Sequence, residues 1–286
     1  MKRIIVVVLL VGIASVAGIV RSYTRNGGSL KSWPHSIKAH STSPDVRDEI
    51  RRTVELSPGA RVNVSGINGA VTIETSDTRT AEIYIERTAE TQEALGRRKI
   101  VINSTPDSLS IKGEKDGSVL GRIFGSNPRE TVTLKLPRQV ALNTSGVNGA
   151  VKVGEIDGPV EVSGINGRVD VAQASGSANF SGINGQVSFA LSSLNKGIDI
   201  SGINGNIELR LSESVNANLE ASGMNGVVTS EMPNVVVDKT SRGNYTARIG
   251  SGGASISASG INGNIRLKGL GKELKLASAQ GKVMGN

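Results

Sequence analysis

The chain has 286 residues, a net charge of +8, no cysteine and seven aromatic residues. Without cysteine it has no disulfide, so the fold must depend on core burial and backbone pairing. The charge excess lies in the first half, with 21 basic against 14 acidic residues in 1–143 and 12 against 11 in 144–286. A nucleic-acid surface needs a basic face with stacking aromatic side chains, and the second half has neither, so no nucleic-acid partner is expected.

The first twenty residues predict export. Residues 4–20 carry no charge and follow Lys2 and Arg3. This length suits the apolar region of a signal peptide and is at the lower limit for crossing a bilayer, so residues 1–20 are a cleaved signal peptide or a retained membrane anchor. Either predicts an exported protein of the cell envelope, periplasmic or on the cell surface, that meets the membrane only through residues 4–20. Residues 21–44 predict a linker, because they are rich in Ser and Gly and lack an apolar period.

Residues 45–144 predict an N-terminal cap rich in strands, together with the first repeats. Apolar and polar residues alternate there at 81–87, 99–103, 108–112 and 131–136. This is the period of a strand with one buried face. Because these segments lack the repeat motif described next, they are expected to cover one open end of the repeat domain, with a loop at 113–128. The basic run at 97–99 is expected to be a solvated loop.

A pentapeptide, Ser-Gly-apolar-Asn-Gly, recurs along the chain, and five copies follow one another at intervals of 18 to 21 residues. The copies begin at Ser65, Ser145, Ser163, Ser181, Ser201, Ser222 and Ser259. Around each serine, apolar residues occupy alternate positions before and after the motif, as on one face of a strand. Each copy therefore predicts two short strands, apolar inside and polar outside, joined at a Gly-x-Asn-Gly corner.

Asn-Gly pairs are also typical of two-residue hairpin turns. An identical apolar register in every copy instead favours a coil, in which each copy forms one rung and equivalent strands stack in parallel about 4.8 Å apart. The predicted fold is all-β, a β-solenoid of stacked two-stranded rungs at 145–268. An outward excursion is expected at 231–253, the chain returns as a last rung at 254–267, and residues 269–286 form a tail.

The corner residues are predicted to have a structural role. Glycine permits backbone angles that a side chain would forbid, and the asparagines are expected to stack in register, bonded to one another or to turn backbone. Ligand binding by the asparagines is the alternative. The predicted corner ladder consists of Gly66, Asn68, Asn148, Gly149, Gly164, Asn166, Gly182, Asn184, Gly202, Asn204, Gly223, Asn225, Gly260 and Asn262.

The residues that most often carry catalysis are scarce in this chain. Both histidines, His35 and His40, lie in the linker, so triads with histidine are excluded from the folded part. No carboxylate cluster has the spacing of metal ligands, and neither a metal nor another cofactor is expected. Four outward carboxylates could approach one another across rungs, namely Glu161, Asp170, Asp199 and Glu208. They alternate with basic residues, which favours solvated cross-strand pairs over a sugar-cleaving pair, and no catalytic residue is assigned.

The order of several segments resembles the bacterial adhesin family of the DUF4097 type. An apolar N-terminal segment precedes Val-Glu-Leu-Ser-Pro-Gly-Ala, then Thr-Val-Thr-Leu-Lys-Leu-Pro-Arg at 131–138, Gly-x-Val repeats, Ile-Gly-Ser-Gly-Gly and a final Gly-Asn-Ile-Arg-Leu. The resemblance covers residues 46–267. It implies a β-solenoid of the bacterial envelope and supplies no catalytic residue.

The function predicted from these observations is that of a non-enzymatic, exported bacterial envelope protein, an adhesin or surface scaffold. Its partner would be a protein or an envelope polymer on a surface. Because loops on a rigid scaffold commonly carry recognition, the segments 231–253 and 113–128 are the expected binding sites. Two alternatives remain open: a membrane-anchored sensor of envelope stress signalling, and a carboxylate-based β-helix enzyme active on polysaccharide.

Overall fold

The computed structural model describes residues 46–115, 127–174, 176–194 and 196–270, which all belong to one compact unit, Pro44–Asn286. Several predictions fall outside the described residues: the signal peptide or anchor at 1–20, the linker at 21–44, most of the loop at 113–128, and tail residues 271–286. None of the helices in the described ranges has the length and apolar character needed to cross a membrane.

The described residues form 21 strands and one short helix. The N-terminal elements are β1 (Val46–Glu55), β2 (Ala60–Ser65), β3 (Gly69–Ser76), β4 (Thr80–Ala89), α2 (Gln92–Gly96), β5 (Arg98–Thr105), β6 (Ser108–Lys115) and β7 (Arg129–Pro137). The central strands are β8 (Val140–Ser145), β9 (Val151–Ile156), β10 (Val160–Ser163), β11 (Val169–Ala174), β12 (Ala178–Asn184), β13 (Val187–Leu191), β14 (Ile198–Asn204) and β15 (Ile207–Leu211). The C-terminal strands are β16 (Ala217–Ser222), β17 (Val228–Ser230), β18 (Val235–Ser241), β19 (Asn244–Ile249), β20 (Ala254–Ser259) and β21 (Ile265–Gly269).

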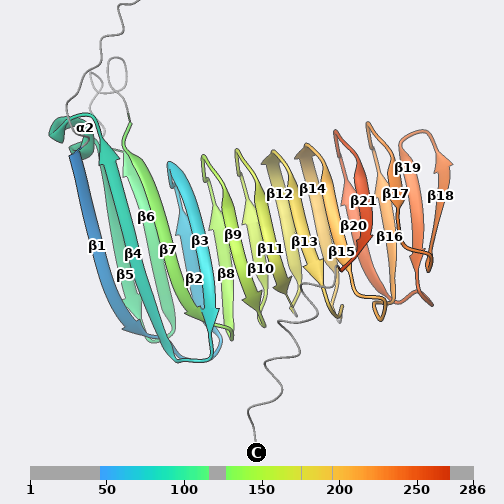
Figure 1. Cartoon of the computed structure of the whole chain (residues 1–286), viewed down its shortest axis with the longest axis horizontal. Helices are drawn as coiled ribbons and strands as arrows, with labels where there is room; N and C mark the ends of the chain where they lie inside the picture. The colour runs from blue at the N-terminus through green and yellow to red at the C-terminus, as the bar shows by residue number, and fades with distance from the viewer. Residues whose placement is uncertain (1–45, 116–126, 175, 195, 271–286) are drawn as a thin grey trace, which may run out of the picture. The chain divides into compact units, whose positions relative to one another are not determined.

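These strands form two large, mostly parallel sheets (Figure 1). Sheet A has the order β1-β4-β7-β3-β9-β11-β13-β15-β21-β17, and sheet B has the order β18-β19-β16-β20-β14-β12-β10-β8-β2-β6-β5. The chain passes from a strand of sheet B through a corner into a strand of sheet A, and the next rung repeats this path. The all-β architecture is consistent with the predicted β-solenoid or a β-helix.

The alternating apolar residues of both sheets meet in one interior. In the rung formed by β12 and β13, Phe180 and Phe189 come from opposite sheets, and their rings pack edge to face with centroids 5.1 Å apart. Neighbouring rungs pair residue for residue, so that Val187 lies between Val169 and Ile207. This register places the same apolar columns on top of one another along the whole core.

The order of the rungs in space differs from their order in the sequence at the C-terminal end. Strand β20 pairs with both β14 and β16, and β21 pairs with both β15 and β17. The rung at 254–267 therefore lies between the rungs that begin at Ser201 and Ser222 (Figure 1). The prediction that it ends the stack was wrong. All copies share one register, so the repeat specifies how two rungs pair. It does not specify which rungs lie next to each other.

A similar insertion occurs at the N-terminal end. Strands β6 and β7 lack the pentapeptide, yet they pair in parallel with β2 and β3, with Leu109 opposite Val62 and Val132 opposite Val71. They form a rung of their own, outside the first motif-bearing rung. The antiparallel strands β5, β4 and β1 then close this end of the stack. Two of the four segments predicted as cap strands therefore extend the stack.

The predicted excursion at 231–253 is an ordered hairpin. Strands β18 and β19 pair antiparallel, and β19 pairs antiparallel with β16, which adds both to the end of sheet B. Tyr245, Ala247 and Ile249 alternate along β19 and are buried in the core. Removing this hairpin would expose the end of the core. The hairpin is therefore part of the folded domain. Val236, on the edge strand β18, is 50% exposed.

The corner column can be tested at Ile183, which is buried in a central rung. We expect Ile183→Asp to lower the free energy of unfolding by about 4 kcal/mol or more, because it buries an unpaired carboxylate. The control Gln186→Glu adds the same charge three residues away, at a partly exposed position beside the Arg168 guanidinium, and should change stability little. Urea unfolding measures both, and equal losses would contradict the inward assignment of Ile183.

Candidate functional site

The seven corner asparagines form one continuous row of side-chain hydrogen bonds. In six of them, all but Asn68, Nδ2 donates to the Oδ1 of the asparagine on the adjacent rung, at 2.9 to 3.3 Å. In spatial order the row is Asn68, Asn148, Asn166, Asn184, Asn204, Asn262 and Asn225. Every bond points toward the N-terminal end of the stack, so the amide dipoles are aligned. Each internal amide still has one N–H and one oxygen lone pair for solvent or a ligand.

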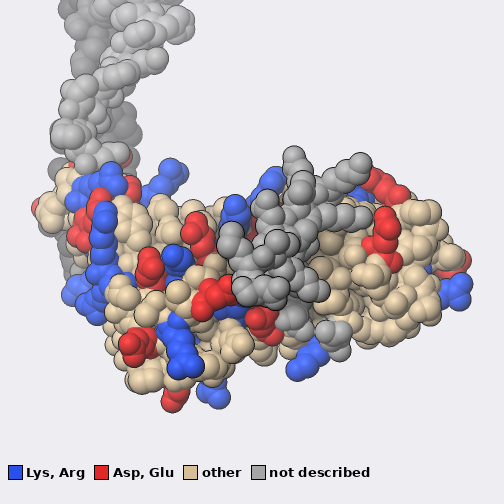
Figure 2. Space-filling model, turned by 60° about the horizontal axis from the view of Figure 1, so that its bottom comes forward, with Lys and Arg blue, Asp and Glu red and all other residues tan. Residues whose placement is uncertain are grey.

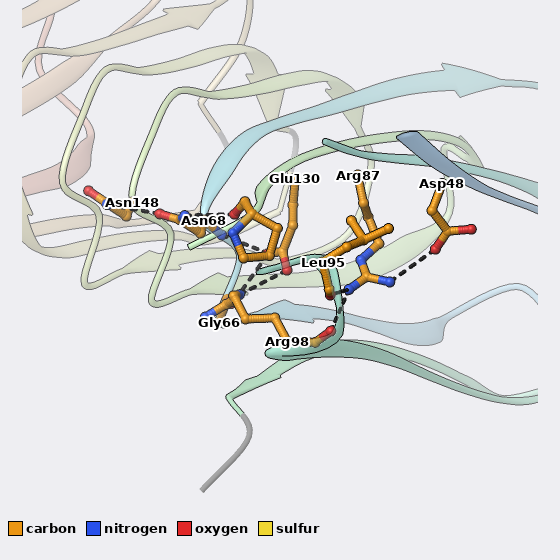
Figure 3. Close-up of polar contacts among 9 residues, drawn as sticks. Asp48, Gly66, Asn68, Arg87, Leu95, Arg98, Glu130 and Asn148 are labelled. Carbon is orange, nitrogen blue, oxygen red and sulfur yellow. Dashed lines mark hydrogen bonds and ion pairs between the residues drawn. The ribbon is translucent and has the colours of Figure 1, made fainter. Parts of the chain in front are cut away.

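The row ends on a buried ion pair at the N-terminal rung (Figure 3). Asn68 donates its side-chain N–H to the Pro128 carbonyl at 2.8 Å and its backbone N–H to Glu130 Oε2 at 2.9 Å. The Glu130 carboxylate is fully buried, and the Arg98 guanidinium, 4% exposed, holds it through two bonds of 2.9 and 3.1 Å. Arg98 also donates to the Gly66 carbonyl. The pair therefore links the first motif-bearing corner, through the Asn68 backbone N–H and the Gly66 carbonyl, to β5 and β7.

A second buried arginine ties the N-terminal elements together (Figure 3). Arg87 on β4 donates to Asp48 Oδ2 of β1 at 3.0 Å, to the Leu95 carbonyl of α2 at 2.7 Å, and to the Arg98 carbonyl of β5. The expectation of a solvated loop at 97–99 was wrong for Arg98. The sequence did carry a signal for this ion pair. Glu130 lies at the same alternate, inward-facing positions of its strand as Val132 and Leu134, and a buried carboxylate needs a cationic partner.

The corner glycines allow neighbouring rungs to come into backbone contact. A Cβ at Gly185 would lie 2.1 Å from the carbonyl oxygen of Gly167, and the same contact recurs along this column of glycines. Gly182 is different: its φ is +60°, and an added Cβ would find its nearest atom 3.7 Å away. Gly185 is thus required by the close approach of neighbouring rungs, and Gly182 is required by its left-handed backbone.

The outer face of sheet A carries mixed charge (Figure 2). Lys152, Asp170, Ser188, Glu208 and Arg266 stand opposite one another on successive strands. Lys268 and Glu208 form an ion pair of 3.0 Å across two of these strands. Ser188 has the outward parity expected for it, but only 6% of it is exposed.

The outer face of sheet B is hollowed into a trough of about 560 Å³. It crosses β2, β8, β10, β12 and β14. Its lining includes Ala141, Pro159 and Ser177. The polar side chains that line it are Arg61, Asn63, Asn143, Glu161, Asn179 and Asp199. Asn143 Nδ2 donates to Glu161 Oε2 at 3.2 Å. We call this region the sheet B trough.

The four carboxylates considered from the sequence do not gather in one place. Glu161 and Asp199 lie on sheet B with the strand of Asn179 between them, and both line the trough. Asp170 and Glu208 lie on sheet A with Ser188 between them. The stack therefore separates like charges by one strand on each face, which limits their repulsion.

Two ionisable side chains on β1 have a shifted pKa. A hydrogen bond from Arg51 lowers the pKa of Glu49, and a hydrogen bond to Tyr84, together with the nearby Glu86, raises the pKa of Arg47. These groups lie on solvent-exposed parts of β1 and β4, where water screens the interaction. Within the described ranges no group of three or more histidine, cysteine or acidic residues is arranged to hold a metal ion.

Comparison with known proteins gives similarity at the level of the backbone. No model of a known protein family matches the sequence, and no curated protein matches it. A solved structure of a candidate cell adhesion protein from Clostridium sporogenes is 15% identical, with 79% of this chain and 100% of that chain covered and a TM-score of 0.42. A candidate adhesin from Bacteroides fragilis is 11% identical, with coverage of 78% and 97% and a TM-score of 0.27. A candidate lipid-binding protein from Parabacteroides distasonis is 13% identical, with the same coverage and a TM-score of 0.28.

The two kinds of corner glycine are expected to differ in their tolerance of a methyl group. Gly182→Ala should cost about 1 to 2 kcal/mol, the strain of a left-handed alanine. Gly185→Ala should cost more, about 3 kcal/mol, because the adjacent rung must move away from the new Cβ. Thermal and urea unfolding of the two variants compare them directly. A smaller loss for Gly185→Ala would show that the rungs are less tightly stacked than the structure has them.

The buried ion pair gives a second stability test. Glu130→Gln leaves the Arg98 guanidinium buried without its counter-charge, and we expect it to lower the free energy of unfolding by about 3 to 5 kcal/mol. Combining it with Arg98→Met removes the unpaired charge and should recover part of that loss. Urea unfolding of the single and double variants provides the comparison. If the double variant is no more stable than Glu130→Gln, the unpaired charge is not the cause of the loss.

Proposed function

We propose that this chain is a non-enzymatic, exported bacterial envelope protein of the DUF4097 type that acts as an adhesin or surface scaffold. One observation carries the proposal. The stack is solidly packed inside and presents outward rows of equivalent positions, each repeated from rung to rung. Such a surface suits a large or repeating partner, because many weak contacts at a fixed spacing add up to firm attachment.

The packing of the interior supports a surface-based function. Columns of Val, Ile, Leu and Phe fill the space between the sheets, and Phe180, Phe189 and Ile183 are among its fully buried side chains. Hollows on the described residues open to solvent, and the sheet B trough spans five strands. Recognition on the outer faces is therefore favoured over chemistry in an enclosed site.

Two features of the sequence support the rest of the proposal. The uncharged segment at 4–20 favours export, whether it is cleaved or retained. The residues that follow the linker contain neither histidine nor cysteine, which favours binding over nucleophilic catalysis. The hairpin at the C-terminal end is a less favourable binding site than the outer faces, because its inward residues are needed for the core.

Attachment can be measured by co-sedimentation. The purified full chain is mixed with washed envelope fragments of the bacterium that produces it, and we expect it to pellet saturably with them. The Ile183→Asp variant, which should be unfolded, controls for non-specific adsorption. A folded chain that stays in the supernatant at every envelope concentration would refute the adhesin or scaffold function. Release of soluble sugar fragments would instead support the enzymatic alternative.

A further inference from the structure

The length of the sheet B trough suits an extended ligand. The five strands beneath it are consecutive in sheet B and stack in parallel. Four intervals of about 4.8 Å give a length of about 19 Å along the stack axis. A ligand in the trough would therefore lie along the stack and meet a new rung at each interval.

The lining of the trough is rich in groups that bind hydroxyls. Glu161 and Asp199 each offer a carboxylate that accepts hydrogen bonds, and the Asn63 and Asn179 amides both donate and accept. Asn143 Oδ1 is buried and has no hydrogen-bond partner among the described residues. The Asn143 Nδ2 group donates to Glu161 Oε2 at 3.2 Å, which orients that carboxylate in the trough. Sugar hydroxyls both donate and accept, so they match this mixture of groups.

We propose that the sheet B trough binds an extended β-1,4-linked glycan strand that runs along the stack axis. This inference rests on the proposed function and gives its partner a chemical class. In an extended strand of this linkage, each sugar advances by close to one rung spacing. Neighbouring sugars are turned by about half a turn, so every second sugar presents the same edge to every second rung. The Glu161 and Asp199 carboxylates repel a polyanion, which favours an uncharged strand.

Calorimetric titration of the full chain tests the proposal with two uncharged hexasaccharides, cellohexaose and chitohexaose. We expect at least one of them to bind. Maltohexaose has the same sugar as cellohexaose in a coiled chain and should not bind. Replacing both trough carboxylates, Glu161→Ala with Asp199→Ala, should weaken binding at least about tenfold, because two charge-assisted hydrogen-bond acceptors are lost. The matched variant on sheet A, Asp170→Ala with Glu208→Ala, should leave the affinity within about twofold.

Several results would overturn the trough assignment. Circular dichroism first establishes that both double variants are folded. Failure of both hexasaccharides to bind, or equal loss of affinity in the sheet A variant, would refute it, whereas cleavage of a bound hexasaccharide would refute the non-enzymatic function. So would loss of envelope attachment after protease treatment of the envelopes, since that identifies a protein partner. If the chain still sediments with envelopes while neither hexasaccharide binds, the glycan proposal fails and the proposed function stands. If the chain does not sediment with envelopes and neither hexasaccharide binds, the glycan proposal and the proposed function both fail.

Discussion

The structure depends on continuous backbone pairing through the corners. At a central corner, the Asn184 N–H donates to the Ile165 carbonyl of one neighbouring rung at 2.8 Å, and the Gly185 N–H donates to the Asn204 carbonyl of the other at 3.0 Å. The pairing of the two sheets therefore does not stop where the chain turns. It requires backbones close enough to exclude a Cβ, which explains the glycines, and the asparagine side chains then bond along the same axis.

Everything else in the domain follows from this stacking or deals with its ends. In-register rungs bury the same apolar columns throughout, and they repeat the outward positions at the same spacing. The first and last rungs leave strand edges and corner groups without a partner rung. At the N-terminal end antiparallel strands and the Arg98–Glu130 pair satisfy them, and at the C-terminal end a hairpin extends sheet B. The segments that cover the two ends of the stack therefore depart most from the repeated sequence.

The same geometry connects stability with recognition. The interior is filled, so the groups available to a partner are those that the rungs present outward. On sheet A these groups carry charges of both signs, and Lys268 and Glu208 pair with each other. On sheet B amides and carboxylates line a trough, and Asn143 donates to Glu161 within it. The two faces of one stack therefore differ in what they leave free to bind.

The sequence by itself determined the parallel two-stranded rungs, the inward columns and the row of asparagines, because each depends on residues only a few positions apart and recurs in every copy. It also indicated that Glu130 is buried, because the alternating pattern of its strand places Glu130 on the inward face. Only the tertiary structure decided the spatial order of the rungs, the insertion of β20 and β21 before β16 and β17, and the joining of Arg98 to Glu130 across 32 residues. The physical reason is that identical registers make every rung an acceptable neighbour for every other. Which rung fills which position is therefore set by the connections and the ends of the stack.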